Sequence, residues 1–490
     1  MKRALRIALL ISLSAAAGSA SAADLLGVYQ DALSNDPAIR EADATRKANR
    51  EVRPQAWAAL LPNIQGQASY TRGETDQTRP SAQNDPTTGT IRVFDQQSVF
   101  RPDTTSWAVN LRQRLFSWSD WANLRASNSQ VAQAEADYQA AEQSLIVRTA
   151  QAYFNVLSAQ DTVEAQQAAL DAFARQLDQA NKRFEVGLIA ITDVQETKAA
   201  RDTAAADVIQ AKRALATAEE QLREVTSQKY EQLARPGDTM PLKSPDPASE
   251  QDWVNMSMEQ NLALVSSRLQ ADTARENVRV AFGGHLPELD LVGTRDHSRG
   301  SGTAAFGSLT GLSAQAPFPT EANDKTYGLQ VTVPIFSGGL TQSRVRQSQY
   351  LWIAAKERVT RTSRATERAA RDAYLGVISN IANVEALRQG LESRQTALKA
   401  TEAGYEVGTR TSVDVLDARR LLVQAQTAYL RSRYDYLLTV IQLRQAAGDL
   451  DRKTLEEMNA LLTEMRATAP TAPNAPVPVP PPAQQPPPPR

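Results

Sequence analysis

One glycine turn occurs twice in this sequence, and its repetition constrains the fold more than any other feature. Residues 184–194 and 405–415 lie 221 positions apart and agree at five of eleven positions, including Gly187 and Gly408. Away from the turns, 156–165 and 377–386 keep the same offset and agree at five of ten. The chain is therefore expected to hold two copies of one structural unit, each with a sharp reversal at its glycine.

Two runs have the pattern of very long helices. Residues 119–186 contain neither Gly nor Pro, which allows a helix of roughly 100 Å. Mostly apolar residues recur there every seven positions, with one four-residue shift, and form a seam along the helix. Residues 340–406 repeat this seam 221 positions later. The seam residues of the first copy are Leu124, Val131, Tyr138, Leu145, Thr149, Val156, Val163, Leu170, Leu177 and Phe184. This is coiled-coil spacing, so each long helix needs a partner. We expect the chain to return from each glycine turn as a second helix.

Two-residue alternation predicts four strands, two in each copy, at about 62–72, 104–116, 287–297 and 325–337. In the second of these, Trp107, Val109 and Leu111 share one face and Arg112 lies on the other. The polar segments between paired strands are expected to be loops. Each strand suits a tilted crossing of a bilayer, which takes about 9–11 residues. Four strands cannot enclose a watery lumen, so two, three or four copies must share one barrel.

The remaining segments complete the expected organisation. Residues 1–22 have the basic start, apolar run and Ala-Ser-Ala cleavage site of a signal peptide, so the chain is exported. The first repeat covers 23–235, with a helical stretch at 24–59 interrupted near 35–37 and at Pro54, and a hairpin tip at 187–193. A linker or equatorial segment at 236–252 leads to the second repeat at 253–448, whose tip is 408–414. An equatorial C-terminal segment at 449–466, with a short helix over 451–465, precedes a disordered Pro-rich tail at 467–490.

Composition excludes several classes of function. The net charge is −1 and the chain has no Cys and only two His, which argues against a general nucleic-acid binder, a disulfide scaffold or a thiolate metal site. The sequence has no paired nucleophile and base, no phosphate-binding loop and no zinc-ligand spacing. His285 beside a Leu-Pro strand start is not a metal-ligand set. We expect no enzyme activity, no cofactor and no metal.

Four stretches resemble the TolC family of outer-membrane efflux and type I secretion channels. They are RFEVGLIAITDV at 183–194, VGTRTSVDVLDA at 407–418, AYFNVL at 152–157 and GHLP at 284–287. The resemblance covers the mature chain up to the tail. It implies a mainly α fold with transmembrane β-strands, in which a homotrimer shares a twelve-stranded β-barrel continued by a periplasmic α-barrel. It also implies an inner-membrane efflux or ABC transporter and a periplasmic adaptor as partners in multidrug or protein export.

The turns carry the candidate gate and pore residues. Asp414 and Asp417 are three apart and share a helical face; the resemblance implies that they form an acidic, cation-selective ring at the periplasmic entrance, where crowding would raise some of their pKa values. Tyr405 and Arg410 replace Phe184 and Ile189 of the first copy.

The first copy keeps Thr192 and Asp193 at its turn. A charge-assisted bond from Arg410 and a contact from Tyr405 to Asp193 would latch the hairpins. The resemblance implies links of this kind at the closed entrance. The alternative is that Tyr405 ends the seam and that Arg410 is solvated.

The tip residues Gly187, Leu188, Gly408 and Thr409 are assigned adaptor docking by the resemblance alone, because turn geometry explains the glycines. Two other functions stay open at this point. A periplasmic adaptor would show one hairpin with lipoyl-like and β-barrel domains, and a general diffusion porin would be open at rest.

Overall fold

The computed structural model describes residues 23–85, 87–237, 240–306, 314–317 and 319–467. The predicted signal peptide, and the predicted tail beyond residue 467, lie outside these ranges. The chain divides into two compact units: Met1–Thr45, Glu135–Val265 and Thr360–Arg490 form unit 1, and Arg46–Ala134 and Ser266–Val359 form unit 2.

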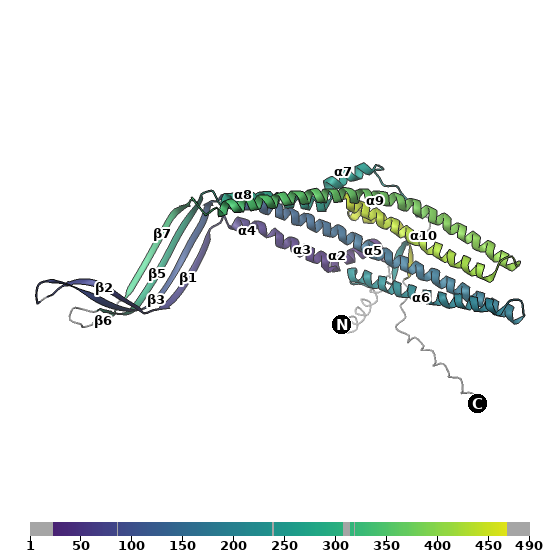
Figure 1. The fold of residues 1–490 in the computed structure, drawn as a ribbon, viewed down its shortest axis with the longest axis horizontal. Helices are drawn as coiled ribbons and strands as arrows, with labels where there is room; N and C mark the ends of the chain where they lie inside the picture. The colour runs from purple at the N-terminus through teal and green to yellow at the C-terminus, as the bar shows by residue number, and fades with distance from the viewer. Residues whose placement is uncertain (1–22, 86, 238–239, 307–313, 318, 468–490) are drawn as a thin grey trace, which may run out of the picture. The chain divides into compact units, whose positions relative to one another are not determined.

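Two long helical hairpins dominate unit 1, as the repeated seam predicts. The outgoing helices are α5 (Trp118–Glu185) and α9 (Leu340–Glu406), and the returning helices are α6 (Ile191–Thr226) and α10 (Ser412–Ala447) (Figure 1). Seam residues Leu145, Val156, Val377 and Val384 are buried, because the hairpin helices pack along them. No helix in the described ranges has both the length and the apolarity needed to cross a bilayer.

The predicted N-terminal helical stretch is three helices, α2 (Leu25–Asn35), α3 (Pro37–Arg50) and α4 (Val52–Ala58). The first interruption lies at Asp36, where predicted. The second lies at Glu51 rather than at Pro54. Pro54 is the third residue of α4, where its missing N–H has no intrahelical acceptor to lose.

An apolar core at the base of the hairpins contains a two-stranded sheet that the sequence did not indicate. Strand β4 (Gln232–Pro236) pairs antiparallel with β8 (Leu462–Ala467). The predicted helix over 451–465 is therefore only α11 (Arg452–Asn459) followed by a strand, and the predicted linker ends in α7 (Glu250–Gln260). These short segments gain their structure by packing on the long helices, since neither strand is stable alone.

Two tyrosines anchor this core. The Tyr153 hydroxyl donates to the carbonyl oxygen of Ala234 at 2.5 Å, and the Tyr434 hydroxyl donates to Asp161 Oδ2 at 2.7 Å. Burial raises the pKa of Tyr434 to about 12 because the anion would lose its hydration. Both groups are neutral donors at physiological pH.

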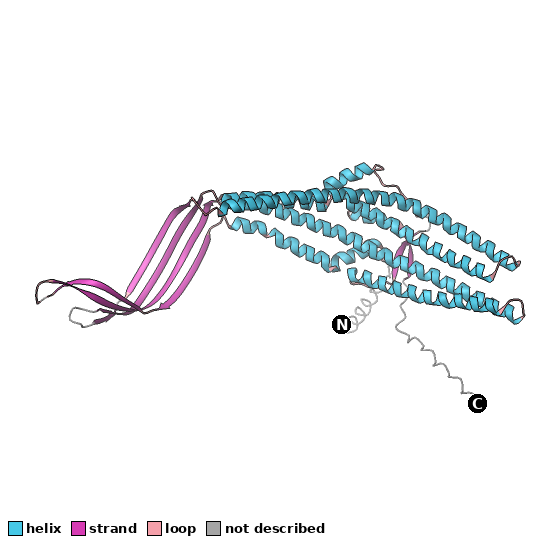
Figure 2. Cartoon of the chain, viewed as in Figure 1, coloured by secondary structure: helices cyan, strands magenta, loops and turns pink. Residues whose placement is uncertain are grey.

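Unit 2 holds a six-stranded antiparallel sheet. Its strands are β1 (Asn63–Arg72), β2 (Thr75–Asn84), β3 (Ile91–Phe116), β5 (Glu288–Phe306), β6 (Ala314–Pro317) and β7 (Thr320–Thr332). The central pair is β3–β5; β1 and β2 both pair with β3, and β6 and β7 both pair with β5 (Figure 2). Helices α4, α8 (Leu262–Gly283) and the first turns of α5 and α9 complete the unit.

The strands differ from their predicted bounds at the polar segments. The stretch expected to be a loop after residue 72 is largely strand β2 and the extended start of β3. It reverses at Asp85, whose carboxylate accepts from the Thr87 N–H at 2.9 Å, and at Gly89, whose φ is +66°. An Asx turn of this kind closes a polar hairpin without apolar residues, so hydropathy patterning missed it.

The second repeat shows the same deviation. Strand β5 continues to Phe306, beyond the predicted end at 297, and β7 begins at Thr320. Strand β7 ends at Thr332 instead of 337, because Pro334 has no N–H to donate to a ladder.

The polar face of the sheet holds an ion-pair network around the buried carboxylate of Asp290. Arg112 Nη2 lies 2.6 Å from Asp290 Oδ2, and Arg114 Nη1 lies 2.7 Å from Asp120 Oδ2. The Asp290 side chain is 2% exposed. The alternation placed Arg112 on this face but could not supply its partner 178 residues away.

Candidate functional site

The two glycine turns have the same backbone geometry. Gly187 and Gly408 have φ of +74° and +80°, the left-handed conformation that a Cβ disfavours. The N–H of Leu188 donates to Arg183 O, and that of Thr409 to Gly404 O, each at 2.8 Å. The glycine N–H groups donate to the carbonyl oxygens three residues earlier, at 2.9 Å from Gly187 and 3.2 Å from Gly408, which completes a Schellman motif at each tip. The predicted reversals are confirmed, and backbone geometry accounts for both glycines.

The return helix α10 begins with a capping box that α6 lacks. Thr411 N–H and Oγ1 both lie 2.9 Å from Asp414 Oδ2, and Asp414 N–H donates back to Thr411 Oγ1. The backbone and side-chain hydrogen bonds from Thr411 lower the pKa of Asp414. Within one chain the pKa of Asp414 is therefore shifted opposite to the rise expected from crowding in a ring. The ring itself stays a prediction.

The second predicted ring residue has a partner of its own. Asp417 Oδ1 forms an ion pair with Arg420 Nη2, one helical turn further along α10. Both side chains are more than half exposed. Asp414 and Asp417 thus differ, because Asp414 is held by neutral donors and Asp417 lies beside a cation.

A hydrogen bond joins the two hairpins at the start of their return helices. The Ser412 hydroxyl donates to Asp193 Oδ1 at 3.0 Å, and Ser412 is 5% exposed. Asp193 occupies the position in α6 that Asp414 occupies in α10. The N-cap of α6 is Ala190, whose side chain has no oxygen to bond with Asp193 or its backbone. The Asp193 carboxylate is therefore available to the second hairpin.

Tyr405 makes a second link between the hairpins. The Arg183 guanidinium lies over the Tyr405 ring at 5.1 Å from its centroid, a cation–π contact. Tyr405 and Asp193 line one cavity of about 280 Å³, together with Ser412 and Arg419. The structure thus brings the predicted gate residues Tyr405 and Asp193 to one cavity. Their partners differ from the predicted ones, because Asp193 bonds to Ser412 and Tyr405 contacts Arg183.

Arg410 does not bond to Asp193 in the described chain. Its side chain folds back against the end of α9, where a Cβ on Gly404 would lie 2.8 Å from Arg410 Cγ. Gly404 therefore makes the room that Arg410 occupies. Thr192, the remaining predicted gate residue, is exposed on the first turn of α6. The tip residues Leu188 and Thr409 are exposed as well.

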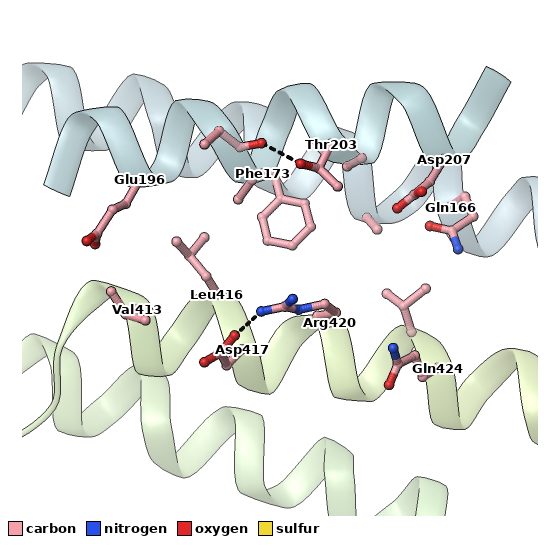
Figure 3. A pocket seen from close by; sticks show the side chains of 15 residues that line it. Gln166, Phe173, Glu196, Thr203, Asp207, Val413, Leu416, Asp417, Arg420 and Gln424 are labelled. Carbon is pink, nitrogen blue, oxygen red and sulfur yellow. Dashed lines mark hydrogen bonds and ion pairs between the residues drawn. The ribbon is translucent and has the colours of Figure 1, made fainter. Parts of the chain in front are cut away.

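A groove runs between the first hairpin and α10 (Figure 3). Its cavity volume is about 460 Å³. Phe173 and Leu416 give it an apolar floor, while Glu196, Asp417 and Arg420 lie along its length. Among the described residues, no cluster of three His, Asp or Glu side chains could hold a metal ion.

Sequence reasoning missed Ser412, Arg183 and Gly404. The comparison of the copies contained a signal for each of them, because their partners 221 positions away are Ile191, Gly404 and Arg183. An apolar residue exchanged for a hydroxyl, and an arginine exchanged for glycine, mark positions where the repeats diverged in chemistry. Only their placement opposite Asp193, Tyr405 and Arg410 shows what that chemistry contacts.

Paired long hairpins continuing from an amphipathic antiparallel sheet are the architecture of an outer-membrane channel extended by a helical conduit. A family model described as "Outer membrane efflux protein" matches residues 28–228 and 253–449. The chain belongs to this outer membrane efflux protein family.

Known proteins give the same result. Outer membrane protein TolC of Vibrio cholerae is 35% identical over 451 residues, covering 91% of this chain and 96% of that protein. The alkaline protease secretion protein AprF of Pseudomonas aeruginosa is 28% identical over 89% of this chain and 87% of its own length. The crystal structure of the Campylobacter jejuni CmeC outer membrane channel superposes with a TM-score of 0.67 at 20% identity, covering 91% of each chain.

The chain is therefore an outer-membrane channel for efflux or secretion, as the sequence resemblance predicted. The relatives and the structure described above are neither periplasmic adaptors nor general diffusion porins. Its two hairpins and amphipathic sheet also lack the single-hairpin pattern expected of an adaptor.

Proposed function

We propose that three copies of the chain form one passive exit duct, with the hairpin ends as its periplasmic gate. Strands β1 and β7 pair with β3 and β5 on one side only within the described sheet, and an open edge in lipid would leave backbone groups unpaired. Four strands side by side in each of three chains would close a twelve-stranded barrel. Exposed apolar residues on α9, including Tyr350, Leu351 and Ile353, would pack between copies.

The hydrogen bond between Ser412 and Asp193 carries the gating proposal. It ties one hairpin to the other near their tips, and the Arg183–Tyr405 contact lies beside it. Opening the conduit requires the hairpins to move apart, so these contacts favour the closed state. Arg410 has no bond to Asp193 within the chain, and we assign it and Thr192 to the contact with the neighbouring copy.

Conductance in planar bilayers tests the gate. We expect low conductance for the native channel and higher conductance for Tyr405→Phe with Arg410→Ser. A matched control is Phe184→Tyr with Ile189→Ser, which alters the equivalent positions of the first hairpin. Unchanged conductance in the first variant would reject the gate assignment, and high resting conductance of the native channel would favour an open porin.

Asp414 and Asp417 are proposed to select cations at the entrance. Carboxylate rings favour cations electrostatically, but the Arg420 beside Asp417 offsets part of that charge. Asp414→Asn should therefore reduce cation selectivity more than Asp417→Asn, and Arg420→Gln should increase it. Reversal potentials in a salt gradient measure all three, and equal values for every variant would exclude the ring.

The partners are proposed to be a periplasmic adaptor and an inner-membrane transporter that supplies energy and substrate choice. The exposed tip residues and the groove beside Leu416 offer helical surfaces on which an adaptor could pack. The description of the matching family supports efflux, and the name of AprF supports protein export. Site-specific crosslinking from Leu188 and Thr409 in cells, with identification of the captured proteins, tests docking; exposed positions far from the tips serve as controls.

A further inference from the structure

Cross-strand register divides the sheet of unit 2 into an apolar and a polar face. Residues in register on adjacent strands point to the same face. The apolar face carries Ile64, Val109, Leu111, Leu291, Leu329 and Val331; the polar face carries Gln65, Asn110, Arg112, Asp290, Thr294 and Gln330. In a channel of the outer membrane the apolar face contacts lipid and the polar face lines the lumen.

The two ends of the sheet face different compartments. Strand β1 follows α4 at Asn63, and β3 runs into α5 after Phe116, so these residues mark the end from which the periplasmic helices continue. Arg72 and its partner Asp103 lie at the opposite end of this strand pair. Positions toward Arg72 therefore approach the outer leaflet.

Two cations face each other on the lipid side, beyond the apolar residues Leu291, Leu329 and Val331 at the helix end. Arg295 on β5 is directly opposite Lys325 on β7, in register with Val109 of β3, and both side chains are exposed. Like charges placed opposite one another destabilise a pair of strands. Their sequence neighbours Asp296 and Asp324 point to the other face, so they cannot compensate the charge. Neither cation forms an ion pair in the sheet as described.

The surrounding cations are matched by acids. Arg72 Nε lies 3.4 Å from Asp103 Oδ1, and Arg299 is in register with Glu321. Arg295 and Lys325 have no acid in register with them. Two adjacent cations on a lipid-facing surface, with no acid opposite them, can bind an anion from outside the chain.

Aromatic side chains mark the depth of this pair. The Arg295 guanidinium lies over the Trp107 ring at 6.0 Å from its centroid, and His297 lies 5.9 Å from the same ring. His297 Nδ1 is 2.8 Å from Asn323 Oδ1. Trp residues gather where acyl chains meet headgroups, and the guanidinium is held at the level of that ring.

We propose that Arg295 and Lys325 together bind the phosphate of an anionic lipid headgroup at the membrane surface. The guanidinium offers paired donors to phosphate oxygens, and the ammonium adds a point charge on the other side. A shared phosphate removes the repulsion between the two cations. The site would fix lipid against the barrel wall between β5 and β7, and it does not depend on the gate at the hairpin ends.

The full-length channel, purified in neutral detergent, tests the site by its thermal melting. Phosphatidic acid, phosphatidylcholine and inorganic phosphate are titrated separately. We expect phosphatidic acid to raise the Tm of the native channel, and we expect the other two to have little effect. Arg295→Gln with Lys325→Gln should weaken the apparent affinity for phosphatidic acid about 30-fold, since each cation near an anionic headgroup is worth about five-fold.

Two further variants separate charge from folding. Arg295→Lys with Lys325→Arg keeps both charges and should keep the response, and Arg79→Gln, a cation opposite Gln96, is the matched control. Without phosphatidic acid, the double glutamine variant should melt no lower than the native channel, because the repulsion is gone. If that variant fails to fold, Lys325→Gln alone should show the five-fold loss.

Three results would overturn the proposal. They are an unchanged phosphatidic acid response in the glutamine variants, equal stabilisation by phosphatidylcholine, and equal stabilisation by inorganic phosphate. The last would indicate a free-anion site, and the second would indicate general lipid packing.

Discussion

Replacing Ser412 with Ala removes the hydroxyl that links the two hairpins. The lost bond is 3.0 Å long, its donor is nearly buried and its acceptor is the Asp193 carboxylate. A hydrogen bond to a charged group contributes about 1.5–3 kcal/mol. At about 1.5 kcal/mol, the closed state of each protomer would lose about tenfold in its equilibrium with the open state. The change creates no clash because Ala is smaller than Ser. It also keeps the helix, because Ala has the highest helix propensity.

Single-channel recording in planar bilayers is the assay. Ser412→Ala should open more often at rest than the native channel, and Ser393→Ala, an exposed serine on α9, should not. In a double-mutant cycle, adding Ser412→Ala to Asp193→Ala should have little further effect, since the acceptor is already missing. Native conductance for Ser412→Ala, or fully additive effects in the cycle, would refute the link as part of the gate.

Three further results follow from the same local geometry. Thr411→Ala removes a donor that lowers the pKa of Asp414, so cation selectivity should be lost at a higher pH than in the native channel when reversal potentials are titrated toward acid. Tyr434→Phe should lower the Tm followed by circular dichroism, because the buried Asp161 carboxylate loses a donor worth about 1.5–3 kcal/mol. Burial raises the pKa of Tyr434 from 10.0 to about 12, so its stabilisation is complete below pH 10 and lost as the pH rises through 12; the Phe variant should lack that alkaline loss. Gly408→Ala should speed amide exchange at the tip, because a Cβ in left-handed backbone costs about 1–2 kcal/mol and nothing lies within 4 Å to add a clash; unaltered exchange would contradict this.

Much of the fold could be predicted because its signals are periodic. The heptad seam predicted the hairpins, and the repeated Glu-Val-Gly turn predicted their tips. The alternation in β1 and at the end of β3 predicted the amphipathic strands. Each of these patterns depends on residues near one another in the chain, where spacing alone decides which face is buried.

Other parts depended on partners far away in the sequence. Strands β4 and β8 are separated by the whole second repeat and are ordered by the core on which they pack. The β2–β3 extension is closed by an Asx turn at Asp85 instead of by apolar residues. Neither has a local hydrophobic period, so pattern reasoning placed a helix over most of β8 and a loop over β2.

The sequence by itself determined the duplication, the reversal at each glycine and the positions at which the copies differ. Tyr405 and Arg410 were found in this way. Only the tertiary structure decided that Asp193 receives Ser412, that Tyr405 lies under Arg183 and that Gly404 makes room for Arg410. The physical reason is that helical period specifies which face a side chain occupies, whereas the packing of two hairpins specifies what that face meets.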